Sequence, residues 1–371
     1  MSENGPEIGI GIVGGGYMGK AHAAAFASVA TLFDTTLRPR LEMVCATSTA
    51  SAERYRAAYG FARATDDWRV LVEDPKVEAI VIASPQETHK DIALAAFALG
   101  KPVLCEKPLA ETPDDARAMV EAAEAAGVAN AIGFNYMRTP ATQFARKLIA
   151  EGRIGDVTSF RGEMTEDFYA DPDAPASWRT SGDANGCMGD LAPHPINCAH
   201  ALIGPITRLH AVVETVHAER GGVAVTNDDQ AHLQVEFENG VSGSIFVSRI
   251  ATGRKMGYAY DIYGTKGAIR FDGEDQNALW LYLAEGPEAE RGFRKILTGP
   301  EHPDYLPFCQ GPGHGTGYQD QIIIEAKDFL NAIASGTAVW PTFEEGLAVN
   351  KVVAACLASS RMGAWVSVAD F

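Results

Sequence analysis

The chain lacks the features that mark membrane, secreted and nucleic-acid-binding proteins. Among its 371 residues, no apolar run reaches the roughly 18 that a membrane-spanning helix needs. The opening run, Met1-Ser2-Glu3-Asn4-Gly5-Pro6-Glu7, has neither a basic nor an apolar signal region. The net charge of −17 comes without a basic cluster, which argues against nucleic-acid and anionic-membrane partners. We therefore expect a soluble, cytoplasmic protein.

Cysteine is scarce and forms no metal or disulfide pattern. The six cysteines lie at positions 45, 105, 187, 198, 309 and 356, without the close paired spacing of a zinc site. No His-Glu or Cys-His spacing suggests another metal. A cytoplasmic chain of this size needs no disulfide framework. We expect reduced, mostly packed cysteines and no metal.

The chain does contain enough apolar sequence for two cores, since 46% of its residues are hydrophobic. In the first 135 residues, short apolar strands alternate with helical stretches, the pattern of a parallel sheet with helices on both faces. The expected strands are 8–13, 41–46, 79–83, 102–105 and 130–133, and the expected helices are 17–29, 52–59, 88–99 and 113–126. We predict an α/β fold that begins with a doubly wound Rossmann domain over residues 1–138.

Beyond residue 138 the pattern becomes that of an α+β domain. The expected strands are 157–162, 209–216, 232–238, 241–249, 259–263 and 279–283, and the expected helices are 139–150, 191–202, 319–334 and 343–359. Asn239-Gly240 between two alternating strands is a strong hairpin signal. We predict a substrate-binding and oligomerisation domain over 139–371, with a large, mostly antiparallel open sheet. Its free face suggests a homo-oligomer, a dimer or tetramer, and the helix at about 343–360 can pack back on the first domain.

A glycine-rich loop joins the first strand to the first helix. It reads Gly14-Gly15-Gly16-Tyr17-Met18-Gly19. Gly14 allows a tight turn, Gly16 lets the backbone approach a pyrophosphate, and Gly19 allows the helix to pack close to the sheet. A strand-to-helix turn without a ligand is the alternative, but the alternating context favours dinucleotide binding, with the phosphates at the helix N-terminus.

The end of the second strand bears on the choice between NAD and NADP. An acid there would bind the adenosine ribose of NAD, but the sequence reads Ala46-Thr47-Ser48-Thr49-Ala50. Ser48 and Thr49 can donate to a 2′-phosphate and Arg54 can reach it, although an arginine at this place is often only solvated. The cofactor is therefore NAD or NADP, with a slight preference for NADP.

Four motifs together resemble the Gfo/Idh/MocA family, of glucose–fructose oxidoreductase and inositol dehydrogenase type. They are the glycine loop, Ser84-Pro85-Gln86-Glu87-Thr88-His89, Glu106-Lys107-Pro108, and Gly189-Asp190 followed by His194. Two further stretches, Phe134-Asn135-Tyr136-Met137-Arg138-Thr139-Pro140 and Ala170-Asp171-Pro172 leading to Ser177-Trp178-Arg179, look more like sugar dehydrogenases of levoglucosan dehydrogenase type. Asn197 departs from the pattern, since many relatives carry an aspartate there.

The resemblance implies a dehydrogenase whose catalytic residues are Lys107, Asp190 and His194. Oxidising a secondary alcohol requires a hydride acceptor and a base for the hydroxyl proton. His194 is the natural base, because an imidazole titrates near neutral pH, and Asp190 can orient it. Lys107 can stabilise the developing alkoxide, and Glu106 can hold Lys107 or line the cofactor site. Taken singly, each residue also has an ordinary structural interpretation.

Other residues are weaker candidates. Cofactor contacts are expected from Ser84, Pro85, Gln86, His89, Glu106, Lys107, Asn135, Trp178 and Arg179. Substrate contacts are expected from Lys107, Asn135, Arg138, Asp190, His194, His314 and Tyr318. The alternatives are a turn for Pro85 and Gln86, a tie between domains for Asn135 and Arg138, and a structural stacking pair for Trp178 and Arg179.

The sequence predicts an NAD(P)-dependent oxidoreductase that acts on a secondary alcohol of a neutral sugar, anhydrosugar or cyclitol. One alternative is a non-redox glycosidase or dehydratase of the same superfamily that uses bound NAD transiently. The other is a dinucleotide-sensing binding protein. The presence of both Lys107 and His194 counts against the sensor.

Overall fold

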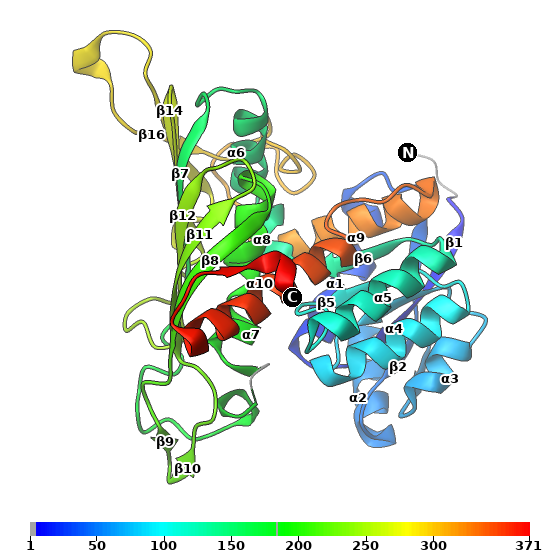
Figure 1. Ribbon diagram of the computed structural model, residues 1–371. Coiled ribbons are helices and arrows are strands. Elements are labelled where there is room, and N and C mark those ends of the chain that lie inside the picture. The colour runs from blue at the N-terminus through cyan, green and yellow to red at the C-terminus, as the bar shows by residue number, and fades with distance from the viewer. Residues whose placement is uncertain (1–4, 183–184) are drawn as a thin grey trace. The chain divides into compact units, whose positions relative to one another are not determined.

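The chain forms two compact units in the computed structural model, which describes residues 5–182 and 185–371 (Figure 1). Unit 1 comprises Met1–Arg138 and Gly317–Asn350, and unit 2 comprises Thr139–Thr316 and Lys351–Phe371. Residues 317–350 therefore cluster with unit 1, although the sequence-based division assigned them to the second domain.

Unit 1 is built on a six-stranded parallel sheet with the strand order β3-β2-β1-β4-β5-β6. Its strands are β1 (Glu7–Val13), β2 (Arg38–Cys45), β3 (Arg63–Thr65), β4 (Ala79–Ile82), β5 (Val103–Glu106) and β6 (Asn130–Gly133). Every residue of β4 and β5 is buried, as expected for strands covered on both faces. The order reverses between β1 and β4, which creates the switch point where such sheets bind dinucleotides.

The helices of unit 1 follow its strands along the chain. They are α1 (Tyr17–Leu32), α2 (Thr49–Tyr59), α3 (Trp68–Glu73), η1 (Gln86–Thr88), α4 (His89–Ala98), α5 (Pro113–Ala126), η2 (Asn135–Arg138), α9 (Tyr318–Ser335) and the beginning of α10 (Phe343–Met362). Local sequence explains their ends: Thr112 caps α5, and Gly127 ends it at a φ of 62°. Helix α9 packs on α1, so a distant segment completes the Rossmann unit.

Unit 2 is built on a nine-stranded sheet with the order β16-β15-β14-β13-β7-β12-β11-β8-β17. The strands are β7 (Val157–Thr165), β8 (Ile206–Glu214), β11 (Gln230–Phe237), β12 (Ser242–Ser248), β13 (Ala259–Gly264), β14 (Gly267–Asp272), β15 (Ala278–Leu283), β16 (Arg294–Leu297) and β17 (Val366–Ser367). All neighbours are antiparallel except β7 and β12. The hairpin expected at Asn239-Gly240 is confirmed, with Gly240 at a φ of 82° between β11 and β12.

Helices cover one face of this sheet (Figure 1). They are α6 (Pro140–Ala150), α7 (Cys187–Asp190) and α8 (Pro193–Leu202). Short elements complete the unit: β9 (Glu219–Arg220), β10 (Val223–Ala224), η3 (Trp178–Thr180), η5 (Gly273–Asp275), η6 (Glu288–Glu290) and η7 (Val368–Asp370). Near the sheet edge, the N–H groups of Ala211 and Val213 donate to the hydroxyls of Ser359 and Ser360 on α10, both at 3.0 Å, so side chains satisfy part of the edge backbone.

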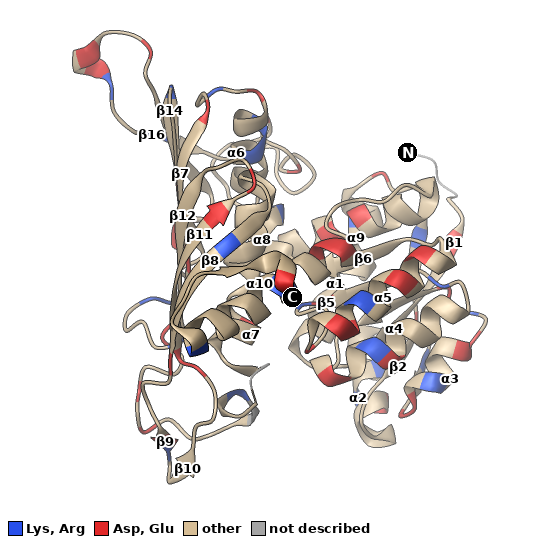
Figure 2. Ribbon diagram, viewed as in Figure 1, with Lys and Arg blue, Asp and Glu red and all other residues tan. Residues whose placement is uncertain are grey.

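The predicted fold class is confirmed for both units. The sequence-based prediction missed several elements of six residues or fewer, which are β3, α3, α7, β9, β10, β14, β16 and β17. Within residues 5–182 and 185–371, none of the helices combines the length and apolar character needed to cross a membrane. Acidic and basic residues are interspersed along the ribbon of each unit (Figure 2).

Candidate active site

The glycine loop of unit 1 has the geometry of a phosphate-binding turn. Gly14 has a φ of 103°, a conformation that favours glycine. A Cβ on Gly19 would lie 1.8 Å from the Gly14 carbonyl oxygen, so glycine is required for α1 to approach β1 this closely. A Cβ on Gly16 would meet nothing within 4 Å, which leaves open space beside the N-terminus of α1. These features fit a dinucleotide pyrophosphate.

Two tyrosines of α2 support this loop from behind. The hydroxyl of Tyr59 donates to the Gly15 carbonyl oxygen at 3.0 Å, and a Cβ on Gly15 would lie 2.0 Å from the ring of Tyr55. Arg54 stacks its guanidinium over Tyr55 at 4.9 Å. Arg54, the residue expected to bind a 2′-phosphate, is thus exposed and stacks on the ring of Tyr55 beside the glycine loop.

The carboxylate of Asp66 lies beside the segment that follows β2, although Asp66 itself follows β3. Ser48 caps α2, and Thr49 donates to the Asp66 carboxylate at 2.5 Å. This hydrogen bond holds the pKa of Asp66 below its usual range. Asp66 follows β3, which pairs with β2, so a neighbouring strand supplies the acid that the sequence seemed to lack. The missed signal was Asp66-Asp67 directly after a strand of three residues.

His89 joins the loops that follow β4 and β5. Its ring is buried, with Nε2 at 2.9 Å from the Ser84 carbonyl oxygen and Nδ1 at 3.0 Å from that of Pro108. Burial lowers the pKa of His89. Ser84 is also fixed through its hydroxyl, 2.6 Å from that of Thr88. The His89 ring therefore binds the backbone of the loop after β4 and of the loop after β5, which favours positioning of these loops over direct ligand contact.

Glu106 is held on both carboxylate oxygens. Oε1 lies 2.8 Å from Nε2 of His22 on α1, and Oε2 accepts the Lys107 N–H at 3.3 Å. Gly133, at the end of β6, gives the carboxylate room, since a Cβ there would lie 3.1 Å from it. The arrangement matches one of the two expected roles of Glu106, which is to fix the strand end that carries Lys107.

Asn135 and Arg138 of η2 have partners within unit 1. Asn135 donates to Oε1 of Gln321 at 2.9 Å. Arg138 forms an ion pair with Asp328 and donates to the Trp340 carbonyl oxygen at 3.2 Å. Both side chains are buried. These contacts tie η2 to α9 and to the segment before α10, and they occupy groups that we expected to meet substrate hydroxyls.

Tyr318, at the start of α9, lies against the glycine loop. Its hydroxyl is 3.2 Å from Sδ of Met18, and its ring lies 5.9 Å from that of Tyr17 and 6.0 Å from that of Tyr136. Burial raises the pKa of Tyr318. Tyr17 itself is 73% exposed, so an aromatic surface borders the start of α1.

In unit 2, Asp190 and His194 lie on two successive short helices. Asp190 ends α7 instead of beginning the helix of His194, because α8 starts at Pro193. Arg179 donates to Oδ2 of Asp190 at 3.4 Å. His194 is 6% exposed, and Asn197, the departure from the family pattern, is fully buried. The side chain of Trp178 lies outside the described part of the structure.

A buried charged network that the sequence did not reveal supports this region. Arg249 donates to Oδ1 of Asp229 at 2.9 Å and to the Arg179 carbonyl oxygen at 2.6 Å. Asp228 accepts the Met188 N–H at 2.7 Å, and burial raises its pKa. The network therefore holds both η3, with Arg179, and α7, which ends at Asp190. In the sequence it was signalled by the acidic pair Asp228-Asp229 directly before β11.

The remaining substrate candidate, His314, belongs to an exposed loop of unit 2. Its Nδ1 lies 3.0 Å from Sγ of Cys309. All six cysteines are free thiols. Cys309 is partly exposed, and the remaining five are buried. Among the described residues, no group of three or more His, Cys, Asp or Glu side chains is placed to hold a metal ion.

Comparison with known proteins finds oxidoreductase family models in both the N-terminal and the C-terminal part of the chain. A family model described as "Oxidoreductase family, NAD-binding Rossmann fold" matches residues 8–134. One described as "GFO/IDH/MocA C-terminal domain" matches residues 142–270. The family that the motifs predicted is therefore found in the two expected parts of the chain.

Two relatives that match along nearly the whole chain are named as dehydrogenases. Levoglucosan dehydrogenase of Pseudarthrobacter phenanthrenivorans is 36% identical, over 97% of this chain and 98% of that protein. Inositol 2-dehydrogenase of Rhizobium meliloti is 27% identical, over 98% and 99%. A solved structure of levoglucosan dehydrogenase in complex with NADH and levoglucosan matches with a TM-score of 0.95 at 37% identity, over 98% of this chain and 99% of that one. The chain belongs to the GFO/IDH/MocA oxidoreductase family.

Proposed function

We propose that the protein is an NAD(H)-dependent dehydrogenase that oxidises a secondary alcohol of a neutral sugar, with an anhydrosugar such as levoglucosan as the first candidate. The observation that carries the proposal is the likeness to levoglucosan dehydrogenase along nearly the whole chain. A levoglucosan dehydrogenase has also been solved with NADH and L-sorbose, which adds a ketose to the candidates. We further propose that it acts in the cytoplasm, and its free cysteines are consistent with a reducing compartment.

Each proposed catalytic residue has a separate task. A nicotinamide dinucleotide bound at the glycine loop would accept the hydride. His194 takes the hydroxyl proton, and Asp190 orients the imidazole. Lys107 stabilises the negative charge that develops on the reacting oxygen. The Glu106 carboxylate supports this role of Lys107, since it binds the Lys107 N–H group.

Substitution of these residues tests the assignment. Lys107→Ala and His194→Ala should each lower kcat by at least about a hundredfold, because each removes charge stabilisation or proton transfer. NADH affinity, measured by fluorescence titration, should change little. Lys76→Ala, an exposed lysine of unit 1, is the control for loss of charge. Undiminished turnover in either active-site variant would remove that residue from the mechanism.

We propose NAD(H) as the cofactor in preference to the NADP that the sequence favoured. The supporting observation is the Asp66 carboxylate beside Thr49, since an acid at this position hydrogen-bonds the ribose of NAD and repels a 2′-phosphate. Titration of NADH and NADPH should show at least about tenfold tighter NADH binding. Asp66→Ala should narrow that ratio, and Arg54→Ala should leave it unchanged. Tighter NADPH binding by the wild type would overturn the choice.

A substrate panel tests the activity itself. Purified protein is assayed with levoglucosan, L-sorbose, free monosaccharides, glycosides and inositols, each with NAD and NADP, by the absorbance of reduced nicotinamide. We expect net reduction of NAD with levoglucosan or a related neutral sugar. Cleavage or dehydration of a glycoside without net cofactor reduction would instead indicate the non-redox alternative.

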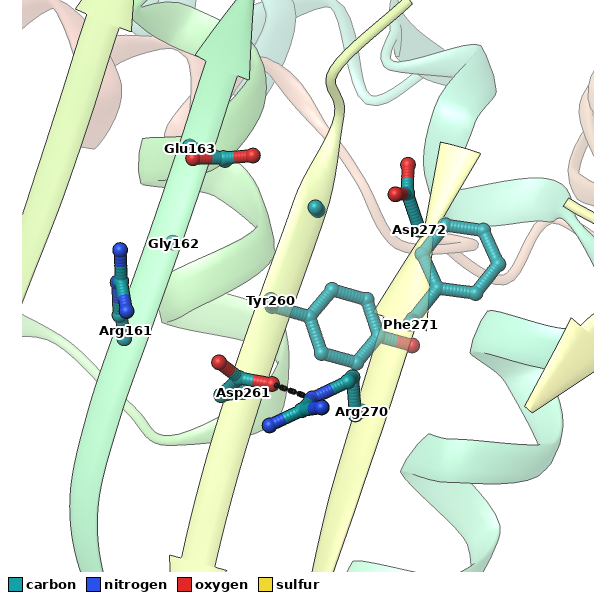
Figure 3. A pocket seen from close by; sticks show the side chains of 9 residues that line it. Arg161, Gly162, Glu163, Tyr260, Asp261, Arg270, Phe271 and Asp272 are labelled. Atoms are coloured by element: carbon teal, nitrogen blue, oxygen red, sulfur yellow. Dashed lines mark hydrogen bonds and ion pairs between the residues drawn. The ribbon is translucent and has the colours of Figure 1, made fainter. Parts of the chain in front are cut away.

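We also propose that the protein forms a homo-oligomer through the uncovered face of the unit 2 sheet. Apolar side chains are exposed there: Tyr263 at 39%, Trp280 at 36% and Val212 at 46%. A polar pocket lies on the same sheet, where Arg270 donates to Asp261 at 2.7 Å (Figure 3). Aromatic side chains and arginines are enriched at protein–protein interfaces, so this face, with Arg161 and Arg270 in its pocket, suits contact with a second copy.

Light scattering after size-exclusion chromatography tests this surface. The wild type should elute as a dimer or tetramer, and Trp280→Glu should reduce the assembly, because it buries a charge in the proposed contact. Val70→Glu, on an exposed residue of α3 in unit 1, is the matched control and should leave the mass unchanged. A monomeric wild type would exclude the proposal.

A further inference from the structure

Glu325 is a buried carboxyl in α9 that the proposed mechanism does not use. It is 1% exposed, and neither carboxyl oxygen has a hydrogen-bond partner among the described residues. Burying a carboxylate without a partner is costly, whereas a neutral carboxyl is far easier to accommodate. The surroundings of this side chain therefore determine its charge.

Helix α9 presents Glu325 toward α1. Spacing of three and four residues places Tyr318, Gln321 and Glu325 on one helix face, and Tyr318 contacts Met18 of α1. Gln319 donates to the Ala21 carbonyl oxygen at 2.9 Å, directly beside His22. This histidine is fully buried, and its Nδ1, like the oxygens of Glu325, has no hydrogen-bond partner among the described residues.

The charges around Glu325 come from four elements. Burial is the main cause that raises its pKa to about 8, and the negative charges of Glu106 on β5 and Asp328 on α9 raise it further. His22 on α1 and Arg138 on η2 oppose this rise. Burial alone would lower the pKa of His22, but its hydrogen bond to Glu106 and the charges of Glu106 and Glu325 raise it overall. The carboxyl is therefore protonated at neutral pH.

We propose that Glu325 is a positioning residue for Lys107 that acts through His22 and Glu106. The inference rests on the proposed function, in which Lys107 is catalytic. His22 holds one oxygen of Glu106 at 2.8 Å, and the other oxygen accepts the Lys107 N–H at 3.3 Å. Hydrogen bonds thus join His22 to the backbone of the catalytic lysine through Glu106. Glu325 acts on His22 and Glu106 through its charge.

The device has two states that differ by one proton on Glu325. While Glu325 is neutral, no negative charge from its side chain competes with the Glu106 carboxylate for His22. When Glu325 releases its proton to solvent, a second negative charge enters the same buried group, repels Glu106 and attracts His22. Glu106 then binds the Lys107 backbone less well, so the lysine is less well placed in the alkaline form.

NMR of the wild type tests the path without any need for turnover. In protein labelled with ¹⁵N-lysine, the Lys107 amide, assigned with Lys107→Arg, should shift with a midpoint near pH 8. The shift should be absent in Glu325→Gln, which mimics the neutral carboxyl, and present in the control Glu121→Gln, an exposed residue of α5. If the chemical shift of the Lys107 amide in the wild type did not change near this pH, the inference would be overturned. This outcome does not depend on whether Glu325→Gln folds.

The pH profile of kcat gives a second readout. Above the midpoint, kcat of the wild type should fall toward the lower value of the alkaline form, because the fraction with neutral Glu325 decreases. This alkaline decrease should be absent in Glu325→Gln and retained in Glu121→Gln, with the KM for the sugar little affected. An unchanged decrease in Glu325→Gln would overturn the inference and leave the proposed function intact. Undiminished turnover in Lys107→Ala would instead refute the catalytic role on which the inference rests.

Discussion

The folding stability of the protein should depend on pH through Glu325. Its pKa is about 8 in the folded chain against an ordinary value of 4.5, so the folded state retains a proton that the unfolded state releases. Because the folded-state pKa is the higher one, the linked stability is fully present below pH 4.5 and is lost as the pH rises through about 8. At about 1.4 kcal/mol for each pH unit, the whole loss is about 5 kcal/mol.

About 3 kcal/mol of this loss falls between about pH 6 and about pH 9. The raised pKa of His22 adds a loss in the same direction at pH values above its ordinary 6.5. Equilibrium unfolding in urea, followed by circular dichroism, gives the free energy of unfolding at each pH. The wild type should lose about 3 kcal/mol more than Glu325→Gln over this range.

The slope of stability against pH is compared because a buried glutamine amide has its own energetic cost, which does not vary with pH. Glu121→Gln, on the exposed side of α5, should follow the wild-type curve. If wild type and Glu325→Gln lost stability in parallel from neutral to alkaline pH, the buried carboxyl would not titrate as described, and the reasoning from its burial would be wrong.

Further substitutions test the charged network of unit 2 and the glycine loop of unit 1. Arg249→Met should destabilise the protein by about 3 kcal/mol in urea unfolding, because buried Asp229 loses its close ion pair and Arg220, at 3.9 Å, remains as its charged neighbour. Arg208→Met, which removes an exposed ion pair, should cost less than about 1 kcal/mol. Equal losses would contradict the first estimate. In the glycine loop, Gly16→Ala should fold normally and weaken NADH binding, because its Cβ would occupy open space. Gly19→Ala should lower Tm sharply by differential scanning calorimetry, because its Cβ would lie 1.8 Å from a carbonyl oxygen; a wild-type Tm would show that α1 can move away.

The sequence predicted the elements with strong local signals. The glycine loop, the buried strands of unit 1 and the hairpin at Asn239-Gly240 depend on residues close together in the chain, where turn chemistry and apolar pattern act directly. The strand β3 gave no such signal, since its three residues read Arg63-Ala64-Thr65. Its existence depends on pairing with β2, which is a tertiary contact.

The candidate site shows the same division. The motif around Lys107 identified the strand end correctly, but nothing local showed that His22 would lie 2.8 Å from Glu106. Likewise, the acid missing after β2 comes from β3 in the form of Asp66. Arg138 was expected to contact substrate or to tie the two domains together, and its ion pair with Asp328, from a helix about 190 residues later, could not be read from the local sequence. Partners that are distant in sequence decide whether a polar side chain is available to a ligand.

The charged network of unit 2 also has a consequence for the order of folding. Asp229 and Arg249 flank the first paired residues of the β11–β12 hairpin, Gln230 and Ser248, at the end farthest from its turn. A hairpin that nucleates at its turn closes this end last. The segment from η3 to α7 can be fixed only after that closure, so the polypeptide that carries Arg179 and Asp190 should gain protection in pulse-labelling hydrogen exchange later than the hairpin does. Catalytic competence would then be among the last properties that the newly made chain acquires.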